Sequence, residues 1–548
     1  MTARPREAGS IRDAFLRIPP FPRARTAPLA TAASHDTVGD PEALLALLRS
    51  TRVGGRYWGA HPALPAGRDL LFAARSRAQL RAMLAAAPAD AAERGIALGV
   101  GGSGLLQIRG ADPWWLVDRS TTLFADAEDE TALVAAIAGR PLRVFGTGRF
   151  TALEGGNPAD LAALLRSELL TRRCWRDPFT GRATRPEAVI AQLAAWRSLI
   201  DGNRDVARIL GVAGWKRETM EALLWDGGAG PRYRADALGG GTTLLWRSRV
   251  PPAMLGQLET KGTPTGEIED GFLRSTGLGA NCVPPLSITV DRSGVHFDPA
   301  RPSDLETLLE RGTIAPAILA RAEALIDRIV AAGLSKYGRG ALPIARPAGQ
   351  RRHVLVTGQV EDDRSVQCGG GGMTNLDLLV AARRAEPDAY LLYKPHPDVE
   401  AGHRKGAIDD LVALRHADRI ERGAPISALL DMVDAIHVLT SLAGFEALLR
   451  DKQVVTHGVP FYAGWGLTRD LGPVPARRTA RRSLAELVAA VLILYPRYLD
   501  PVTRLPCEVE LLVDRMIADQ AMTPSLLERL RIVQGKVKRS VTRLGIGR

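Results

Sequence analysis

The chain contains 548 residues, 46% of them hydrophobic and 24% charged, and its formal net charge is +12. A chain of this length is too long to fold around a single hydrophobic core, so two or three domains are expected. No run of eighteen apolar residues and no apolar N-terminal segment occur, which argues against a membrane-spanning helix and a secretory signal.

The basic residues are spread along the chain without the aromatic-basic motif of a nucleic-acid module, so no nucleic-acid partner is expected. Anionic small molecules or an anionic membrane surface fit the charge better. The four cysteines are singly spaced, which argues against a disulfide framework or a zinc site and is typical of a cytoplasmic protein.

Residues 1–39 begin with an arginine- and proline-rich stretch and predict a disordered lead-in. Residues 40–200 mix helical stretches with a few strand-like runs, among them Leu142–Phe145. A Gly-x-Gly-x-x-Gly motif at 99–104 is followed by a strand-like run and not by a helix. It is therefore weak evidence for a dinucleotide site.

A pattern at 142–197 recurs near the C-terminus, at 455–516. In both places a strand and an aromatic loop precede an aromatic-x-Asp-Pro-x-Thr sequence, which contains Asp177 in one copy and Asp500 in the other, and a helix follows. We interpret this as an internal duplication in which the first copy, residues 40–200, is truncated and degenerate. Chance reuse of Asp-Pro turn chemistry is the alternative.

Residues 201–345 predict the first lobe of a second, complete module. Strand-like runs lie at 242–246 and 284–291, and Asp304–Ala332 has the period of one long helix that ends at Gly333. The link at 338–352 is rich in proline, glycine and arginine, and it marks a domain boundary.

Residues 346–515 predict the second lobe, in which short apolar runs alternate with helices. The predicted strands are His353–Thr357, Tyr390–Tyr393, Ala435–Leu439 and Val454–Thr456. This alternation predicts an α/β fold with parallel sheets in both lobes, and two Rossmann-like lobes facing a cleft form the architecture called GT-B. Residues 516–548 end in a basic stretch that predicts either a membrane-surface helix or a solvated tail.

Two short segments of the second lobe are suited to bind a phosphate group. Thr440 and Ser441 follow a predicted strand and can cap the next helix, the place where open α/β sheets bind nucleotides. Lys394 and His396 lie in a Lys-Pro-His-Pro sequence whose prolines hold the loop rigid, so they can neutralise and hydrogen-bond a phosphate. A turn with a surface histidine is the alternative for the second segment.

Carboxylates follow predicted strands in both lobes. Glu361, Asp362 and Asp363 come directly after the strand at 353–357, and Glu269 and Asp270 lie on a comparable loop of the first lobe. One carboxylate can attack the anomeric carbon of a sugar while a second transfers a proton. A solvated acidic loop is the alternative for 361–363. No Asp-x-Asp metal motif occurs, so neither a metal ion nor another cofactor is expected.

Several motifs of residues 200–515 resemble those of the bacterial capsule polysaccharide β-Kdo transferases of the KpsC type. The motifs are Glu269–Gly279, Gln359–Asp363, Lys394–Asp398, Thr440–Thr468 and Tyr498–Pro501. The resemblance implies a GT-B enzyme that uses CMP-Kdo and builds an oligo-Kdo linker on a lysophosphatidylglycerol anchor at the inner membrane. Members of this family are often tandem proteins with two transferase modules.

The resemblance also implies catalytic roles. Asp363 matches the carboxylate implicated as nucleophile in a retaining double displacement, and Glu269 or Asp270 would be the acid/base. Which of these two residues transfers the proton stays open at this stage.

The remaining site residues are implied to bind the donor. The His-Pro motif (His396, Pro397) and Lys394 would bind the CMP phosphate, and Gln359 would orient the Kdo carboxylate or Asp363. The other expected binding residues are Glu361 and, around the cytidine and ribose, Thr440, Ser441 and Glu446.

The first copy lacks equivalents of these motifs, so one active module and one inactive remnant are expected. The expected partners are the nucleotide-sugar donor, a lipid-linked acceptor, the inner-membrane surface and capsule assembly or export proteins, with the protein on the cytoplasmic side. Two alternatives remain open: another CMP- or CDP-dependent transferase of cell-surface polymers, and a non-catalytic capsule assembly protein.

Overall fold

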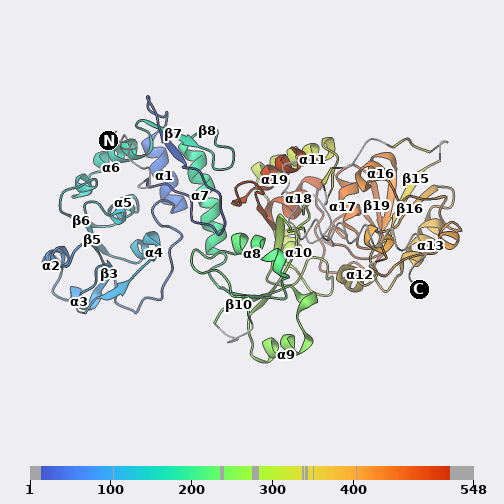
Figure 1. Cartoon of the computed structure of the whole chain (residues 1–548), viewed down its shortest axis with the longest axis horizontal. Helices are drawn as coiled ribbons and strands as arrows, with labels where there is room; N and C mark the ends of the chain where they lie inside the picture. Colours follow the sequence, from blue (N-terminus) through green and yellow to red (C-terminus); the bar gives the residue numbers. More distant parts are fainter. Residues whose placement is uncertain are drawn as a thin grey trace, which may run out of the picture. The chain divides into compact units, whose positions relative to one another are not determined.

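The computed structural model describes residues 14–102, 104–234, 240–274, 283–335, 338–339, 344–347, 349, 351–402 and 404–518 (Figure 1). The chain divides into two compact units: unit 1 comprises Met1–Asp205 with Leu224–Pro231, and unit 2 comprises Val206–Leu223 with Arg232–Arg548. The start of the predicted lead-in, the motif residues 275–279 and the tail from 519 onward lie outside the described residues. Among the described helices, none is long and apolar enough to cross a membrane.

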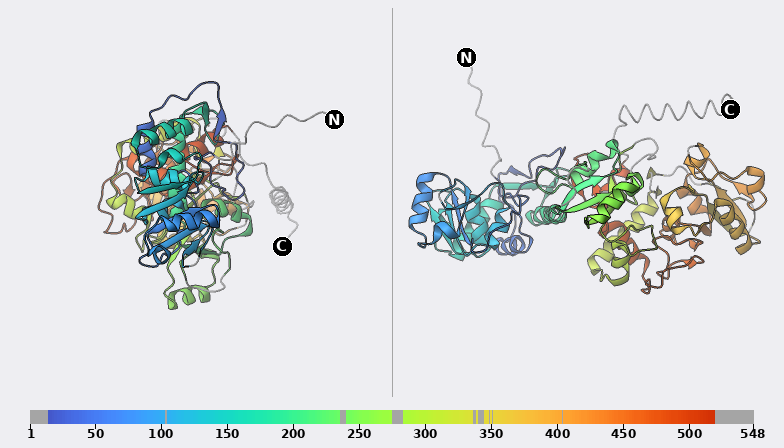
Figure 2. Two further views of the ribbon diagram at one scale, coloured as in Figure 1. Left: turned by 90° about the vertical axis from the view of Figure 1, so that its left-hand side faces the viewer. Right: turned by 90° about the horizontal axis from the view of Figure 1, so that it is seen from below.

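Unit 1 is built on a five-stranded parallel sheet in the order β4-β3-β2-β5-β6 (blue in Figure 2). The strands are β2 (Leu70–Ala74), β3 (Gly95–Gly99), β4 (Leu106–Ile108), β5 (Thr122–Asp126) and β6 (Leu142–Phe145). The accompanying helices are α2 (Arg77–Ala85), α3 (Ala91–Arg94), α4 (Pro113–Asp118) and α5 (Glu130–Ile137). The predicted strand at 142–145 is thus present, and a strand follows the glycine motif.

A smaller antiparallel sheet completes unit 1 and corrects the expected lead-in. It consists of β1 (Ala30–Ala32), β7 (Arg173–Arg176) and β8 (Ala183–Thr184), and the nearby helices are α1 (Pro41–Thr51), α6 (Pro158–Leu169) and α7 (Pro186–Asp201). Residues 14–39 are not a disordered lead-in, because β1 pairs with β7 and Phe15, Leu16 and Phe21 are buried. Burial of these apolar side chains offsets the cost of ordering the segment.

The first lobe of unit 2 contains a mixed sheet in the order β22-β21-β12-β11-β10-β9. Three strands are parallel, β9 (Val206–Leu210), β10 (Thr242–Leu245) and β11 (Thr265–Asp270); β12 (Ser287–Asp291), β21 (Pro496–Leu499) and β22 (Pro506–Cys507) are antiparallel. The expected all-parallel sheet is therefore wrong. Parallel pairing needs a crossover, usually a helix, and Pro284-Pro285 before β12 disfavours one.

Two further expectations for this lobe need correction. The predicted helix 304–332 is two helices, α10 (Asp304–Arg311) and α11 (Pro316–Ala331), because Gly312 and Pro316 interrupt it. The end of the predicted 346–515 lobe returns to the first lobe, since β21 and β22 extend its sheet. The remaining helices are α8 (Arg217–Leu223), α9 (Pro252–Thr260) and α19 (Val509–Ile517).

The second lobe contains a six-stranded, all-parallel sheet in the order β17-β16-β15-β18-β19-β20 (Figure 1). The strands are β15 (His353–Thr357), β16 (Tyr390–Lys394), β17 (Arg419–Ile420), β18 (Ala435–Val438), β19 (Gln453–Thr456) and β20 (Arg469–Asp470). The helices are α12 (Arg364–Gly369), α13 (Asn375–Ala385), α14 (Pro397–Glu400), α15 (Asp410–Ala413), α16 (Ile426–Met432), α17 (Leu442–Leu448) and α18 (Leu484–Val488).

Helices cover both faces of this sheet. Alternate residues of β15 belong to two separate apolar cores, Val354 and Val356 with α13, and Leu355 with α16 and α17. The second of these cores also contains Tyr462 and Trp465 of the aromatic loop, both fully buried, and residues of the first lobe. Unit 2 thus has the two-lobed α/β architecture that the sequence predicts, and shared apolar packing joins its lobes.

The two Asp-Pro segments have the same hydrogen bonds. The Asp177 carboxylate accepts hydrogen bonds from the N–H and the hydroxyl of Thr180. The Asp500 carboxylate accepts the same two bonds from Thr503. The aromatic residue two positions before each aspartate also makes an equivalent bond. The Trp175 indole N–H donates to the Leu169 carbonyl, and the Tyr498 hydroxyl donates to the Leu492 carbonyl, both at 2.6 Å. The two parallel sheets also share the chain order 3-2-1-4-5 from one edge, which is the usual order of doubly wound sheets, and the duplication stays a prediction.

Replacing Asp500 by alanine is expected to destabilise unit 2 more than Asp177→Ala destabilises unit 1. Asp500 is fully buried and also accepts from Arg515 at 2.9 Å, so its loss should cost on the order of 3–5 kcal/mol. Asp177 is partly exposed, and its described side-chain hydrogen bonds stay within its own turn, so its loss should cost about 1 kcal/mol. Urea unfolding measures both changes, and equal shifts would contradict this ranking.

Candidate active site

Three loops meet at the carboxyl edge of the second-lobe sheet. The strand order reverses between β15 and β18, which is where doubly wound sheets bind ligands. Gln359, after β15, bridges this point: its side-chain amide donates to the Thr440 hydroxyl at 3.0 Å and accepts from the Thr440 N–H at 2.8 Å. The loop after β16 joins them, because the Gly358 N–H donates to the Lys394 carbonyl at 2.9 Å.

The acidic loop after β15 is built into the local structure. Asp363 caps α12, where one of its oxygens accepts from the Ser365 N–H at 3.0 Å and from the Ser365 hydroxyl at 2.8 Å. Glu361 accepts from the Asn375 N–H at 2.8 Å at the start of α13. Asp363 is exposed, and among the described contacts it is not bonded to Gln359, which holds Thr440 instead.

The Lys-Pro-His-Pro loop presents its two basic residues with defined geometry. The His396 Nδ1 accepts from the Asp398 N–H at 3.1 Å, so a neutral imidazole carries its proton on Nε2. Pro397 starts α14, where its missing N–H costs nothing. Lys394 donates to the Ala424 carbonyl at 2.7 Å, and burial lowers its pKa while Glu400 and Glu421 oppose the shift.

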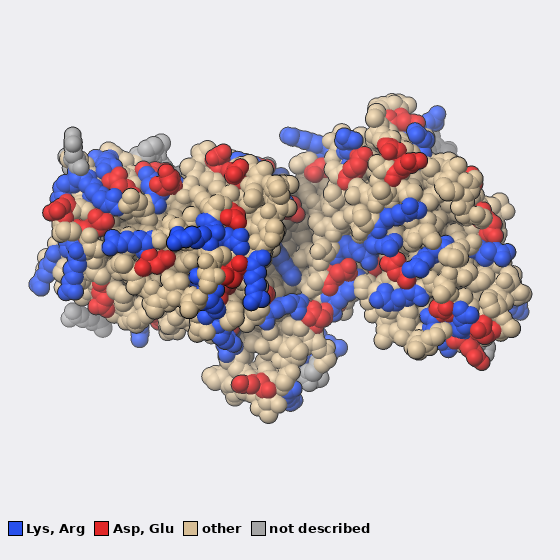
Figure 3. Space-filling model, turned by 180° about the vertical axis from the view of Figure 1, so that it is seen from behind, with Lys and Arg blue, Asp and Glu red and all other residues tan. Residues whose placement is uncertain are grey.

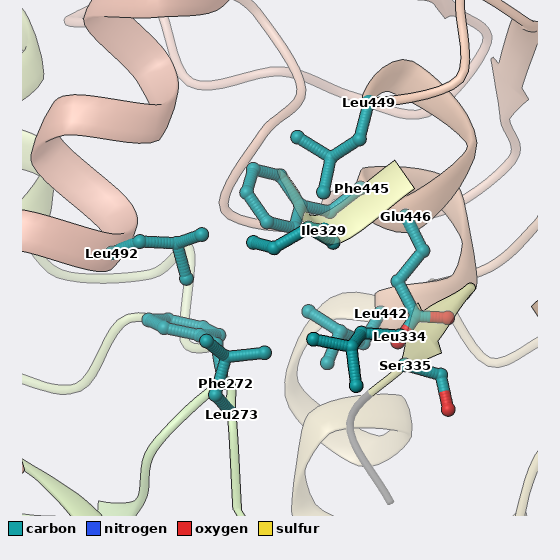
Figure 4. Close-up of a pocket in the computed structure, with 10 residues that line it drawn as sticks. All are labelled: Phe272, Leu273, Ile329, Leu334, Ser335, Leu442, Phe445, Glu446, Leu449 and Leu492. Atoms are coloured by element: carbon teal, nitrogen blue, oxygen red, sulfur yellow. The ribbon is translucent and has the colours of Figure 1, made fainter. Parts of the chain in front are cut away.

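The residues predicted at the start of α17 divide between two environments. Ser441 is the helix cap, accepting from the Ala443 N–H at 3.2 Å, and it follows Thr440 at the sheet edge. Glu446 lies farther along the helix, in a small pocket of about 10 Å³ that it shares with mostly apolar side chains. Figure 4 shows its carboxylate turned toward Leu334 and Ser335, so the structure does not bring Glu446 to the loops described above.

The carboxyl end of β11 contributes a pair of acids on one face. Side chains alternate along a strand, so Glu267 and Glu269 lie on the same side of the sheet. Arg364 of α12 reaches both, at 2.9 Å from Glu267 and 3.3 Å from Glu269. Arg364 immediately follows Asp363 in the chain, so this contact between the lobes brings the acidic loop and Glu269 into one site.

Asp270, on the other face of β11, is held by two cations. Lys216 and Arg274 each lie 2.8 Å from its carboxylate, and the Lys216 ammonium is also 3.4 Å from the centre of the Trp246 ring. Burial would raise the pKa of Asp270, but Lys216 and Arg274 lower it below its ordinary value. Asp270 is therefore a salt-bridged carboxylate whose ionised form is favoured.

Glu269 differs from its neighbour in its proton affinity. Burial raises its pKa to about 8, Asp270 and Glu267 add to the shift, and Arg364 and Lys216 offset part of it. A carboxyl group that titrates near neutral pH is suited to proton transfer, and a salt-bridged one is not. Of the two predicted acid/base candidates, the geometry favours Glu269.

Sequence reasoning missed three residues of this site, Lys216, Glu267 and Arg364. The alternation Glu267-x-Glu269 in a predicted strand could have indicated a pair on one face. No local signal identifies Lys216 or Arg364, because each is one basic residue among 72 and contacts its partner only through the folded chain.

The corresponding edge of unit 1 carries carboxylates instead. Asp129 caps α5 by accepting from the Thr131 N–H, as Ser441 caps α17, and Glu128 precedes it where Thr440 stands in unit 2. Asp126, at the end of β5, is a further carboxylate at this edge, and Gln79 and Arg75 are bonded to it. These carboxylates, one of them paired with Arg75, give this edge a charge that differs from that of the hydroxyl-lined edge of unit 2.

Glu269→Gln is expected to gain stability relative to wild type as the pH rises. The raised pKa of Glu269 means that its contribution to stability is full below its ordinary pKa of 4.5 and is lost as the pH approaches about 8. Glutamine keeps the uncharged form, so the stability difference should grow over this range by at most about 1.4 kcal/mol per pH unit. Urea unfolding at pH 5 and pH 8.5 measures it.

Asp270→Asn is the matched control and has the opposite sign. The lowered pKa of Asp270 stabilises the fold at neutral pH, so the variant should be less stable there and the loss should shrink at acid pH. A Glu269→Gln stability difference that does not change with pH would contradict the assignment of the raised pKa.

Comparison with known proteins supports a family assignment. The family model of capsule polysaccharide biosynthesis proteins matches residues 257–498. The capsule polysaccharide modification protein LipA of Neisseria meningitidis serogroup A is 35% identical over 413 residues, which are 71% of this chain and 58% of LipA. The lipopolysaccharide-processing protein LpsZ of Rhizobium meliloti is 48% identical over 240 residues, 43% of this chain and 54% of LpsZ. The chain thus spans less than two thirds of the length of these relatives.

A solved structure matches along nearly its whole length. KpsC of Thermosulfurimonas dismutans, a β-Kdo 2,4 transferase, is 32% identical with a TM-score of 0.51, and the match covers 57% of this chain and 98% of that one. Together with the matching family model, this places the chain in a known group: it belongs to the capsule polysaccharide biosynthesis family, in its KpsC type.

Proposed function

We propose that this chain is a retaining glycosyltransferase that moves Kdo from CMP-Kdo to a lipid-linked capsule polysaccharide linker. The observation that carries the proposal is the similarity of this chain to the β-Kdo 2,4 transferase KpsC, which covers 57% of this chain and 98% of that structure. The protein would act at the inner-membrane surface, beside the proteins that assemble and export the capsule.

The donor would bind at the loops after β15, β16 and β18. Its phosphate needs hydrogen-bond donors and positive charge, which Lys394 and the Nε2–H of His396 can supply. Ser441 and Thr440 lie at the reversal of strand order, the usual place for the nucleotide in such a sheet. In this proposal the phosphate is held by protein groups and no metal ion takes part, so transfer would continue in EDTA.

The reaction would proceed by two displacements at the anomeric carbon. In the first, an oxygen of Asp363 bonds to that carbon while the bond to the phosphate oxygen breaks, and CMP leaves with the electron pair. In the second, the acceptor hydroxyl oxygen attacks the same carbon, the bond to Asp363 breaks, and the hydroxyl proton passes to Glu269. Two inversions give net retention.

The charges around Glu269 fit this second step. The pKa of Glu269, raised by burial to about 8, allows the group to take up a proton near neutral pH and release it later. Asp270, neutralised by Lys216 and Arg274, would hold the strand end in place without itself transferring a proton.

Asp363→Ala should abolish Kdo transfer, by about four or more orders of magnitude if it is the nucleophile. His396→Ala should slow transfer about 10- to 100-fold because it removes one hydrogen bond to a charged group. The assay incubates purified protein with CMP-Kdo and a synthetic Kdo-primed acceptor, follows CMP release, and determines the product linkage by NMR.

Asp362→Asn is the control, since Asp362 is exposed and pairs with Arg404 at 3.1 Å. This variant should retain wild-type activity. Full activity of Asp363→Ala would remove the proposed mechanism, and the absence of any CMP release by wild type would favour a non-catalytic role.

A further inference from the structure

Three guanidinium groups gather around the buried carboxylate of Glu267. Arg364 lies 2.9 Å from one of its oxygens, and Arg247 and Arg301 each lie 3.7 Å from the other. They come from three parts of unit 2: Arg247 lies two residues after the end of β10, Arg301 lies between β12 and α10, and Arg364 begins α12.

The three arginines differ in their hydrogen bonds and in their exposure to solvent. Arg364 donates to both Glu267 and Glu269 and lies over the Phe297 ring, so its position is fixed. Arg247 and Arg301 remain beyond hydrogen-bonding distance of Glu267, and in the described part of the chain neither donates a hydrogen bond. Their side chains are 37% and 54% exposed, whereas that of Glu267 is only 6% exposed.

The carboxylates of this group leave two of the arginines without a hydrogen-bond partner among the described residues. Glu267 and Glu269 both accept from Arg364. Asp298 also lies near the group, and its described hydrogen bond is to the Ala300 N–H in its own turn. Three arginines therefore face three carboxylates, but only Arg364 is hydrogen-bonded to them. An arginine fork matches a carboxylate or phosphate geometrically, so two partly exposed forks beside a buried anchor form a site for one anionic group.

Arg247 and Arg301 lie on the side of the candidate site where the acceptor is proposed to react. The groups proposed for the donor phosphate follow β15, β16 and β18 of the second lobe, whereas Arg247 and Arg301 belong to the first lobe. Arg364 links the site to Glu269, the group proposed to take the acceptor proton. An acceptor held by Arg247 and Arg301 would therefore lie next to the base.

We propose that Arg247 and Arg301, anchored by Glu267, bind the carboxylate of the acceptor's terminal sugar. This inference depends on the proposed function, and it identifies the chemical group that the transferase recognises on its acceptor. The donor sugar carries the same chemical group, so the test must distinguish the two sources.

The test is the steady-state kinetics of the double variant R247Q/R301Q with CMP-Kdo and a synthetic Kdo-primed acceptor. The acceptor KM should rise about 10- to 100-fold, while the KM for CMP-Kdo and the slow hydrolysis of CMP-Kdo without acceptor stay as in wild type. An acceptor whose carboxylate has been reduced to an alcohol should bind wild type and the double variant equally weakly.

Arg249→Gln is the matched control, because Arg249 is exposed on the same turn as Arg247. A double variant with unchanged acceptor KM would overturn the site. A rise confined to the CMP-Kdo KM would assign the arginines to the donor carboxylate and overturn the acceptor assignment. If wild type hydrolyses CMP-Kdo but the reduced acceptor is used as well as the native one, the site fails while the proposed function stands. No CMP release by wild type under any condition would overturn both.

Discussion

Arg364 makes the contact on which the candidate site depends. It begins α12 of the second lobe and binds Glu267 and Glu269 of the first. A buried carboxylate pair on one strand face would be unfavourable without a cation between its members, because each disfavours ionisation of the other. One guanidinium therefore makes the pair tolerable, fixes the start of α12 where Asp363 is the cap, and keeps the proton affinity of Glu269 from rising further.

The parallel strands explain why charged side chains from distant parts of the sequence lie at one edge of the sheet. Lys216 follows β9, Arg247 follows β10, and Glu269 and Asp270 end β11. Because β9, β10 and β11 are parallel, their carboxyl ends lie at one side of the sheet. The second lobe repeats the arrangement with the loops after β15, β16 and β18, and the Gln359–Thr440 hydrogen bonds hold two of these loops together.

Sequence reasoning succeeded where the signal is local. The strand at His353–Thr357, the Ser441 helix cap and the Asp-Pro turns follow from residues within a few positions of one another. It failed where distant segments decide the outcome. The return of β21 to the first-lobe sheet depends on its pairing with β12 across about 200 residues, and the order of residues 14–39 depends on the pairing of β1 with β7. The position of Arg364 beside Glu269 likewise depends on a contact between segments that are distant in the sequence.

The two units differ in the residues that follow one strand of their parallel sheets. Both keep the parallel sheet and the bonded Asp-Pro turn, so these features serve folding in either unit. At the strand after which unit 2 has Thr440 and Ser441, unit 1 has Glu128 and Asp129. A carboxylate caps a helix as well as a hydroxyl does, which preserves the fold, but it repels the phosphate that a hydroxyl would bind. A change from a hydroxyl to a carboxylate at this position can therefore alter the charge of the strand end while the helix cap is kept.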